Sequence, residues 1–348
     1  MKKSGSIYYC FTNNSTFVKK DLEILSQLGT VSSEKIEAKG LIQLCTGLLR
    51  QLAFLLFRKT DLYVAQFAGF HTVVPAILSM FSKKPFIVIA GGTESVSFPK
   101  LGYGNLRPGV LGFATRLSLK KATHIAAVDE SLIYQNYTYK NPFMEGDQGM
   151  KALISQFNTP HTIIKNGYND FPNFKSADKK TQVVSIVSGA EEERRAILKG
   201  VDFLLEIAAI TPDIQYIIIG ADKIPFPVSK NVTVIPFIGH EELFKVLSVS
   251  RFYAQLSVSE GFPNALCEGM LCECVPIVSA VGGMPEIVGD NGLVLSARDK
   301  NKVKSFLQTN HQGLEETGKR ARKSILERYP LQKREEQLIA LINKLTFS

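Results

Sequence analysis

Residues 252–268 read FYAQLSVSEGFPNALCE, and this stretch decides the fold. The first part, 252–258, is apolar and rich in β-forming residues, which is typical of a buried parallel strand. Asn264 is a good N-cap, and residues 265–271 continue as a helix. This strand–turn–helix order places Glu260 at the carboxyl end of a strand and Glu268 about one turn inside the next helix. Both therefore border the crevice in which open α/β sheets bind ligands.

The chemistry of the two carboxylates points to the kind of ligand. The N–H groups of a helix N-terminus attract phosphate, whereas a carboxylate is a good acceptor for sugar hydroxyls. Glu260 and Glu268 together therefore predict a ligand with phosphate in the middle and polyols on both sides, such as a nucleotide-sugar. Either glutamate could instead serve only the helix dipole, an alternative that fits Glu268 alone better than it fits the pair.

A second glycine turn follows. Residues 275–279 are predicted as another buried strand, and Gly282-Gly283 leads into a helix at 284–288. Here the sequence resembles the retaining glycosyltransferases of family 4 (group 1), which have the GT-B fold. The resemblance is specific from about Lys199 to Leu295, and weaker similarity covers most of the first half. It is carried by Lys199-Gly-Val-Asp202, Glu260 to Glu268, Pro276-Ile-Val278 and Gly282-Gly-Met-Pro-Glu286.

The resemblance implies roles for individual residues. Lys199 would contact the diphosphate, Glu268 would hold the ribose hydroxyls, and Glu260 would hold the transferred sugar. Ile238 would line the base pocket. The backbone between the two glutamates would approach the sugar and phosphates; its residues are Gly261, Phe262, Pro263, Asn264, Ala265 and Leu266. A solvated lysine at a helix start is the alternative for Lys199.

The expected diphosphate arginine is displaced. In the family it usually follows a glycine a few residues before the lysine, but here Ala190 follows Gly189. Arg194 and Arg195 are both candidates to supply this charge from a longer loop, and the sequence leaves the choice open.

Two domains are predicted. Strands at 7–11, 62–65, 86–90 and 124–128 alternate with helices such as 17–28, which indicates a doubly wound parallel sheet. A second sheet starts at 182–187, and the boundary falls in a polar stretch near 168–181 that contains Pro172. We therefore expect an acceptor-binding Rossmann-like domain at 1–170 and a donor-binding one at 171–330. By the resemblance, a helix at 331–346 returns to the first domain.

The acceptor side departs from the family pattern. Where the family often has a histidine or arginine, this chain has Gly91-Gly92-Thr93-Glu94 after the strand 86–90. The acceptor-side candidates are therefore Gly92, Thr93, Glu94 and His71, although a structural role is the simpler interpretation of a single histidine.

Composition argues against a membrane-spanning or secreted protein. The chain has 348 residues and five cysteines, and no apolar run resembles a spanning helix or a secretion signal. We expect reduced thiols in a cytoplasmic protein. Cys267, Cys272 and Cys274 cluster in sequence, but we expect buried thiols there and no bound metal or other cofactor.

Charge is concentrated in the first domain. Residues 1–170 contain 19 Lys and Arg against 11 Asp and Glu, a net +8 of the total +9. A basic domain is attracted to an anionic membrane surface or to nucleic acid, but no aromatic–basic nucleic-acid motif is present.

The helix predicted at 41–57 has two faces. A leucine stripe is expected to cover the sheet: Leu41, Leu44, Leu48, Leu52 and Leu55. Phe54 and Phe57 lie on the other side near Arg50 and Arg58-Lys59, and they are candidates to enter a membrane interface. The predicted location is therefore cytoplasmic, peripheral on the inner face of the membrane.

The expected function is transfer of a sugar from a nucleotide-sugar to a glycan or lipid-linked acceptor, in cell-surface polysaccharide or glycolipid biosynthesis. The resemblance implies retention of anomeric configuration without metal. Two alternatives stay open: a nucleotide-sugar epimerase on the same fold, and a non-enzymatic nucleic-acid-binding protein.

Overall fold

A computed structural model describes residues 5–37, 40–143, 146–171, 178–308 and 313–346. Within them the chain forms two α/β units, each built on a six-stranded, wholly parallel sheet. The predicted fold class, two doubly wound domains, is confirmed. Pro172 of the predicted boundary lies outside the described residues.

The first sheet has the strand order β2-β1-β3-β4-β5-β6. The strands are β1 (Gly5–Phe11), β2 (Gly29–Lys35), β3 (Leu62–Gln66), β4 (Phe86–Ala90), β5 (His124–Ala127) and β6 (His161–Ile163). The helices are α1 (Thr16–Ser26), α2 (Leu41–Phe57), α3 (Val73–Ser82), α4 (Val110–Lys121) and α5 (Met150–Leu153). Every residue of β3 and β4 is buried, because helices cover both faces of the central strands.

The second sheet has the order β12-β11-β10-β7-β8-β9. Its strands are β7 (Lys180–Ile186), β8 (Gln215–Ile219), β9 (Val232–Ile235), β10 (Ser250–Gln255), β11 (Val275–Ser279) and β12 (Leu293–Leu295). Its helices are α6 (Glu193–Leu198), α7 (Val201–Ile210), α8 (His240–Ser248), α9 (Asn264–Leu271), α10 (Met284–Val288), α11 (Lys300–Gln308) and α12 (Leu314–Arg328).

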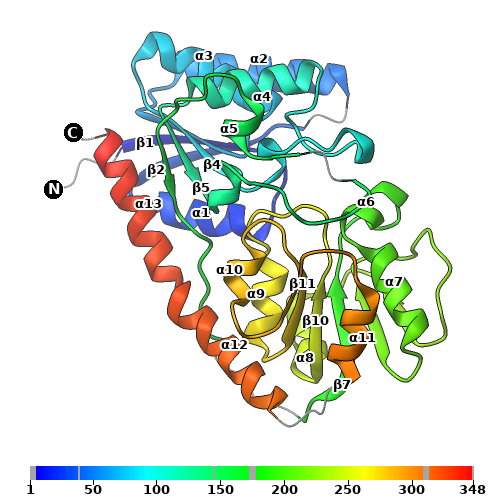
Figure 1. Cartoon of the computed structure of the whole chain (residues 1–348). Helices are drawn as coiled ribbons and strands as arrows, with labels where there is room; N and C mark the ends of the chain where they lie inside the picture. The colour runs from blue at the N-terminus through cyan, green and yellow to red at the C-terminus, as the bar shows by residue number, and fades with distance from the viewer. Residues whose placement is uncertain (1–4, 38–39, 144–145, 172–177, 309–312, 347–348) are drawn as a thin grey trace.

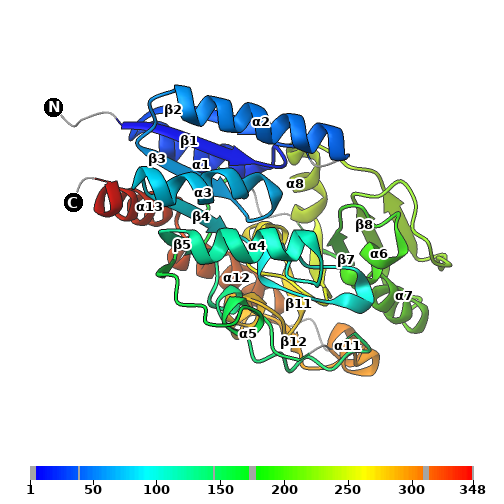
Figure 2. The ribbon, with the colours of Figure 1, turned by 90° about the horizontal axis from the view of Figure 1, so that it is seen from above.

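Alternation along β1 divides the core of the first domain. Ile7, Tyr9 and Phe11 face α1 and the last helix, α13 (Leu331–Thr346), whereas Tyr8 and Cys10 belong to the core on the other face. Figure 1 shows α2, α3 and α4 as a layer on this second face, and Figure 2 shows the three helices side by side.

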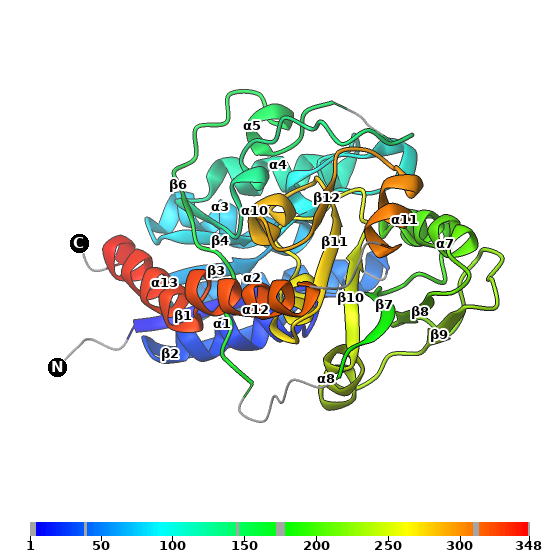
Figure 3. The ribbon, with the colours of Figure 1, turned by 60° about the horizontal axis from the view of Figure 1, so that its bottom comes forward.

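The C-terminal segment crosses from the second domain to the first. Figure 3 shows α12 and α13 as a long helical path across both domains. At the crossing, the N–H of Leu331 donates to the carbonyl of Tyr168 at 3.0 Å, and the N–H of Tyr168 donates to the carbonyl of Tyr329 at 2.9 Å. The segment around Tyr168, which leaves the first domain, and the segment 329–331, which returns to it, therefore lie side by side.

One buried ion pair holds α13 on the first domain. Both oxygens of the Asp21 carboxylate accept from Arg334 Nη2, at 2.7 and 2.9 Å, and Arg334 Nε donates to Oδ1 at 3.0 Å. The exposed fractions of the two side chains are 4% for Arg334 and 0% for Asp21. Arg334 also donates to the carbonyls of Ile164 and Lys165, so it ties α13 to α1 and to the end of β6.

The helix predicted at 41–57 is present with those bounds, and most of its predicted leucine stripe faces the sheet: Leu55 is buried and Leu44, Leu48 and Leu52 are half-buried. Gly47, Gln51 and Leu55 form the buried face, whereas Leu41, placed in the sheet-facing stripe, is 77% exposed. The placement of Phe54 on the polar side was also wrong, because its ring packs on the Tyr8 ring with centroids 5.5 Å apart. The buried stripe follows the shape of the sheet, which a helical wheel does not contain.

We predict that Arg334→Met destabilises the protein by ~3–5 kcal/mol, because the Asp21 carboxylate would remain buried without its cation. Urea unfolding followed by circular dichroism measures this free energy. Lys333→Met, an exposed neighbour on the same helix, is the matched control and should change little. The double variant Asp21→Leu/Arg334→Met should recover much of the loss; equal stability of Arg334→Met and wild type would contradict the role of the pair.

Candidate active site

The candidate active site lies at the carboxyl edge of the second sheet, where β7 and β10 are neighbours. The strand order reverses direction there, so the crossovers that follow the two strands diverge and leave a crevice. Lys199 is the C-cap of α6, and Glu260 lies in the loop between β10 and α9. Both predicted catalytic residues are therefore brought to this crevice.

Lys199 and Glu260 form an ion pair, with Lys199 Nζ 2.6 Å from Glu260 Oε1. The same Oε1 accepts from Gln255 Nε2 at 3.0 Å and from Ser257 Oγ at 2.8 Å. Burial lowers the pKa of the Lys199 ammonium, but Glu260 and the Tyr103 hydroxyl raise it by more, so the net shift is upward. The site thus contains a fixed cation that stays charged at neutral pH.

Two glycines allow close backbone contacts next to this pair. Gly200 has φ +72°, and a Cβ there would lie 2.0 Å from the carbonyl oxygen of Leu256. Gly282 has φ +54°, and a Cβ there would lie 2.0 Å from the carbonyl oxygen of Glu260. A larger residue at Gly200 would push the Lys199 segment away from the end of β10, and one at Gly282 would push the turn before α10 away from Glu260.

The structure separates the two candidate arginines. The Arg195 side chain lies over Gly189, where a Cβ would be 3.2 Å from Arg195 Nη1, and its charge also acts on Lys199. Arg194 instead faces the first domain, since a Cβ on Gly102 would lie 3.1 Å from Arg194 Nη1. Arg195 is therefore the arginine that lies over Gly189 and whose charge acts on Lys199, whereas Arg194 lies against Gly102 of the first domain.

Glu268 occupies a second part of the crevice. Its Oε1 is 3.6 Å from His240 Nε2, the side chain that begins α8. Burial raises the pKa of the Glu268 carboxyl, while His240 and Lys20, which comes from α1 of the first domain, oppose that shift. Ile238, predicted in the base pocket, precedes His240 by two residues, and the adjacent Phe237 is 88% exposed.

The motif between the glutamates uses its side chains for the domain interface. Asn264 is the first residue of α9, and Pro263 is the N-cap, so the predicted cap was wrong. Asn264 Oδ1 instead accepts from Tyr168 OH at 2.5 Å and from Asn166 Nδ2 at 3.2 Å. The Phe262 ring is buried edge-on against Tyr329, with centroids 5.0 Å apart.

The remaining residues of the motif pack against the first domain or the core. Gly261 lies against the first domain, where a Cβ would be 2.6 Å from the carbonyl oxygen of Gly91. Leu266 belongs to the core, and Ala265 packs against that core. The backbone of the motif, rather than its side chains, is thus what remains to face a ligand.

Two acceptor-side candidates turn inward. His71 is buried, its Nε2 lies 3.0 Å from the Gln66 carbonyl, and burial lowers its pKa to about 4. Glu94 is fully buried, and its Oε1 accepts from the N–H groups of Gly91 at 2.6 Å and Gly92 at 3.3 Å. Burial raises the pKa of Glu94 to about 7. Both side chains shape the first domain rather than its cleft surface.

The other two candidates lie at the cleft. Gly92 is close to Gly261, since a Cβ on Gly92 would be 3.9 Å from the Gly261 nitrogen. Thr93 Oγ1 lies 3.3 Å from the hydroxyl of Tyr103, a residue that the sequence did not single out. Burial raises the pKa of Tyr103, and its hydroxyl interacts electrostatically with Lys199 and Glu260 across the domain interface. A single tyrosine between Gly102 and Gly104 carries no motif that could have identified it.

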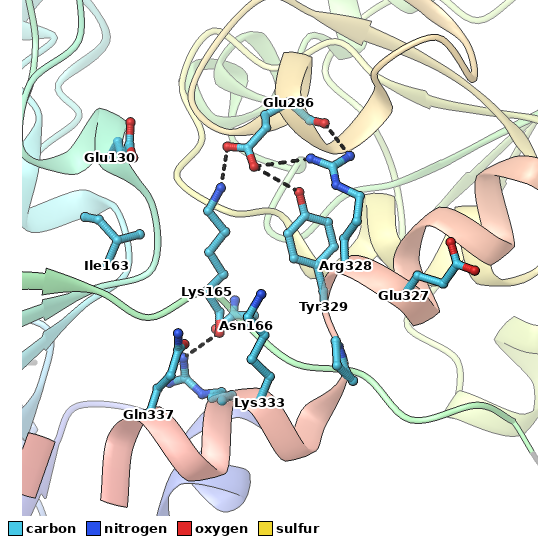
Figure 4. A pocket seen from close by; sticks show the side chains of 12 residues that line it. Glu130, Ile163, Lys165, Asn166, Glu286, Glu327, Arg328, Tyr329, Lys333 and Gln337 are labelled. Carbon is cyan, nitrogen blue, oxygen red and sulfur yellow. Dashed lines mark hydrogen bonds and ion pairs between the residues drawn. The ribbon is translucent and has the colours of Figure 1, made fainter. Parts of the chain in front are cut away.

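A cavity of about 510 Å³ lies on the hinge. Figure 4 shows Glu286 at one end of the cavity, where its carboxylate accepts from Lys165, from Arg328 at 3.2 Å and from Tyr329 OH at 3.3 Å. Lys165 belongs to the segment leaving the first domain, whereas Arg328 and Tyr329 precede α13. The glutamate of the second glycine motif therefore joins the domains.

The described part of the chain contains no group of three or more His, Cys, Asp or Glu side chains arranged to hold a metal ion. Cys267, Cys272 and Cys274 are buried free thiols whose pKa is raised by burial. No helix among the described residues has the length and apolar character needed to cross a membrane.

Comparisons with known proteins agree with this geometry. Residues 185–309 match the family model of the glycosyl transferases group 1. An uncharacterized glycosyltransferase of Methanocaldococcus jannaschii is 35% identical over 116 residues, 30% of this chain and 33% of that protein. One component of the phosphatidylinositol N-acetylglucosaminyltransferase of Arabidopsis thaliana is 22% identical over 202 residues, 50% of this chain and 44% of that protein. The matches thus span less than half of either relative.

Solved structures resemble the chain over nearly its whole length. Sucrose-phosphate synthase from Thermosynechococcus elongatus superposes with a TM-score of 0.73 at 15% identity, covering 98% of this chain and 99% of that one. HepE from Anabaena, in complex with UDP and glucose, gives 0.68 at 15% identity, covering 98% and 100%. The fold is therefore GT-B, and its second domain carries the group 1 glycosyltransferase signature.

We predict that Lys199→Ala and Arg195→Ala each weaken binding of a nucleoside diphosphate by ~1.5–3 kcal/mol, the range for a hydrogen bond to a charged group. Binding of the nucleoside alone should change much less. Arg194→Ala, a neighbouring arginine that faces the first domain, is the matched control. Calorimetry with both ligands measures the difference; equal losses for nucleoside and diphosphate would remove these cations from the phosphate site.

Proposed function

We propose that this chain is a retaining glycosyltransferase that moves a sugar from a nucleotide-sugar to a glycan or lipid-linked acceptor without a bound metal. The observation that carries the proposal is the Lys199–Glu260 pair at the strand-order reversal of the second sheet, with Glu268 about one turn inside α9. The group 1 signature over residues 185–309 and the GT-B fold support it.

The donor would lie along the second domain. Lys199 and Arg195 supply positive charge for the diphosphate, and the N-terminus of α9 adds N–H groups. Glu268 accepts from the ribose hydroxyls, and the exposed Phe237 with Ile238 provides an apolar surface for the base. HepE, a structural neighbour, is described in complex with UDP and glucose, which favours a uridine nucleotide as the first donor to try.

The proposed chemistry is cleavage of the bond between the anomeric carbon and the diphosphate oxygen, through an oxocarbenium-like transition state. The acceptor oxygen bonds to the same face of the anomeric carbon, and its proton passes to the departing phosphate oxygen. Lys199, Arg195 and the helix N–H groups stabilise the negative charge that develops on that phosphate. Glu260 positions the sugar and keeps Lys199 in place.

The acceptor would approach from the first domain, where Gly92 lies near Gly261, and Tyr103, which contacts Thr93, interacts electrostatically with the pair. One relative carries the name of a phosphatidylinositol N-acetylglucosaminyltransferase, which favours a lipid-linked acceptor. We therefore place the activity in cell-surface polysaccharide or glycolipid biosynthesis on the cytoplasmic side of a membrane.

Incubation with a panel of nucleotide-sugars, with and without glycan and lipid-linked acceptors, tests the activity. We expect acceptor-dependent release of nucleoside diphosphate and a product with the donor's anomeric configuration by NMR. An epimerised nucleotide-sugar formed without acceptor would assign the chain to the epimerases, and salt-sensitive binding of nucleic acid without turnover would assign it to nucleic-acid binding.

Glu260→Gln and Glu268→Ala should fail in different ways. Glu260→Gln should lower turnover sharply with near-normal binding of nucleoside diphosphate, because Glu260 is proposed to act on the sugar. Glu268→Ala should weaken nucleotide binding by ~1.5–3 kcal/mol, because it loses hydrogen bonds to the ribose. Full turnover by Glu260→Gln, or unchanged nucleotide affinity of Glu268→Ala, would remove that residue from its role.

A further inference from the structure

The outer layer of the first domain is formed by α2, α3 and α4. The three helices lie side by side over one face of the sheet, and α3 packs against both neighbours. The other face of the sheet is covered by α1 and α13, which belong to a separate core. The outer surface of the three-helix layer is the far side of this domain from α13.

This surface is apolar to an unusual degree. Among the described residues, ten of the thirteen exposed large apolar side chains lie on these three helices. Phe57 is 86% exposed, Phe81 78% and Phe113 69%. The others are Leu41, Ile42, Leu49, Leu56, Ile77, Met80 and Val110. Single exposed apolar residues are ordinary, but a concentration on adjacent elements marks an interaction surface.

The charge on the layer has one sign. None of the three helices contains an aspartate or glutamate. Two consecutive basic residues stand at the C-terminal end of each helix: Arg58-Lys59, Lys83-Lys84 and Lys120-Lys121. Because each helix precedes a strand of one parallel sheet, these three pairs lie along the same edge of the domain. Arg50 of α2 is also 67% exposed, although it pairs with Glu34.

We propose that the three-helix layer is a docking surface for an anionic membrane. Exposed aromatic and aliphatic side chains enter the interface between headgroups and acyl chains, and the basic row binds the anionic headgroups. Charge complementarity favours a bilayer as the partner. The protein surface combines apolar side chains with basic residues, and an anionic membrane presents negative headgroups above an apolar layer of acyl chains.

The surface differs from the one that the sequence predicts. The predicted Phe57 is exposed, but Phe54 packs inward on Tyr8, and Leu49 and Leu56 of α2 join Phe57 instead. The remaining contribution comes from α3 and α4, which the sequence did not single out. The N-terminal ends of the helices lie toward the carboxyl edge of the sheet, so the cleft borders the docked face. If the proposed function holds, a lipid-linked acceptor would reach the cleft from this side.

Co-sedimentation of the full chain with vesicles tests the proposal. One set is phosphatidylcholine, and the other is phosphatidylcholine mixed with phosphatidylglycerol, each at low and high salt. We expect binding to the anionic vesicles that falls with salt. Removal of each basic residue should weaken that binding roughly fivefold. Phe81→Ser/Phe113→Ser should weaken it about tenfold, and Lys59→Glu/Lys83→Glu/Lys121→Glu more strongly.

Matched controls come from the second domain. Val228→Ser removes an exposed apolar side chain there, and Lys300→Glu/Lys302→Glu reverses exposed charges; neither should change vesicle binding. Circular dichroism of every variant establishes that it is folded. Binding that ignores lipid charge, absence of binding, or equal losses in the controls would overturn the proposal.

Sedimentation equilibrium showing a dimer that Phe81→Ser/Phe113→Ser disperses would assign the layer to a second copy instead. Because vesicle binding needs no donor or acceptor, its failure would leave the proposed activity standing.

Discussion

The ion pair between Lys199 and Glu260 is the interaction on which the site depends. It joins the C-cap of α6 to the loop after β10, and close backbone contacts at Gly200 and Gly282 hold these segments next to their neighbours. A half-buried lysine without a partner would be costly, so Glu260 with Gln255 and Ser257 holds the cation in place before any ligand arrives. In the proposed reaction the diphosphate brings a second anion to a cation that is already oriented, which reduces the ordering required when the donor binds.

The same motif couples the site to the hinge. Phe262 and Asn264 lie between the two glutamates in sequence, yet their side chains contact Tyr329, Tyr168 and Asn166 where the chain crosses between domains. Glu286 of the second glycine turn likewise bonds to both connecting segments (Figure 4). Residues proposed to contact the donor and residues that contact the connecting segments between the domains are therefore close together in sequence. Closure of the cleft around a ligand would act directly on these contacts.

Prediction from sequence succeeded where a local pattern and the tertiary environment agree. The strands 62–65, 86–90 and 275–279 were found because burial on both faces leaves continuous apolar runs. The edge strand β2, of sequence GTVSSEK, was missed because one side of an edge is solvated and no such run exists. Glu273 has φ +60°, in the position after α9 where glycine is favoured, and nothing in the residue type predicts that conformation. On α2 only Leu41 and Phe54 were misjudged, because a helical wheel does not show where the sheet ends, and packing decides which apolar side chains it covers.

The sequence by itself determined the alternation of strands and helices, the two glutamates at a strand end and in the following helix, and the concentration of positive charge before residue 171. These are properties of order along the chain, set by hydrophobic periodicity, turn chemistry and residue type. Only the tertiary structure decided that Arg195 lies over Gly189 while Arg194 faces the first domain, that Tyr103 interacts electrostatically with the pair from the other domain, and that His71 and Glu94 turn inward. Only the structure also joined α2, α3 and α4 into one apolar, basic surface. Each of these depends on contacts between segments far apart in sequence, and the side-chain positions that produce them are set by packing.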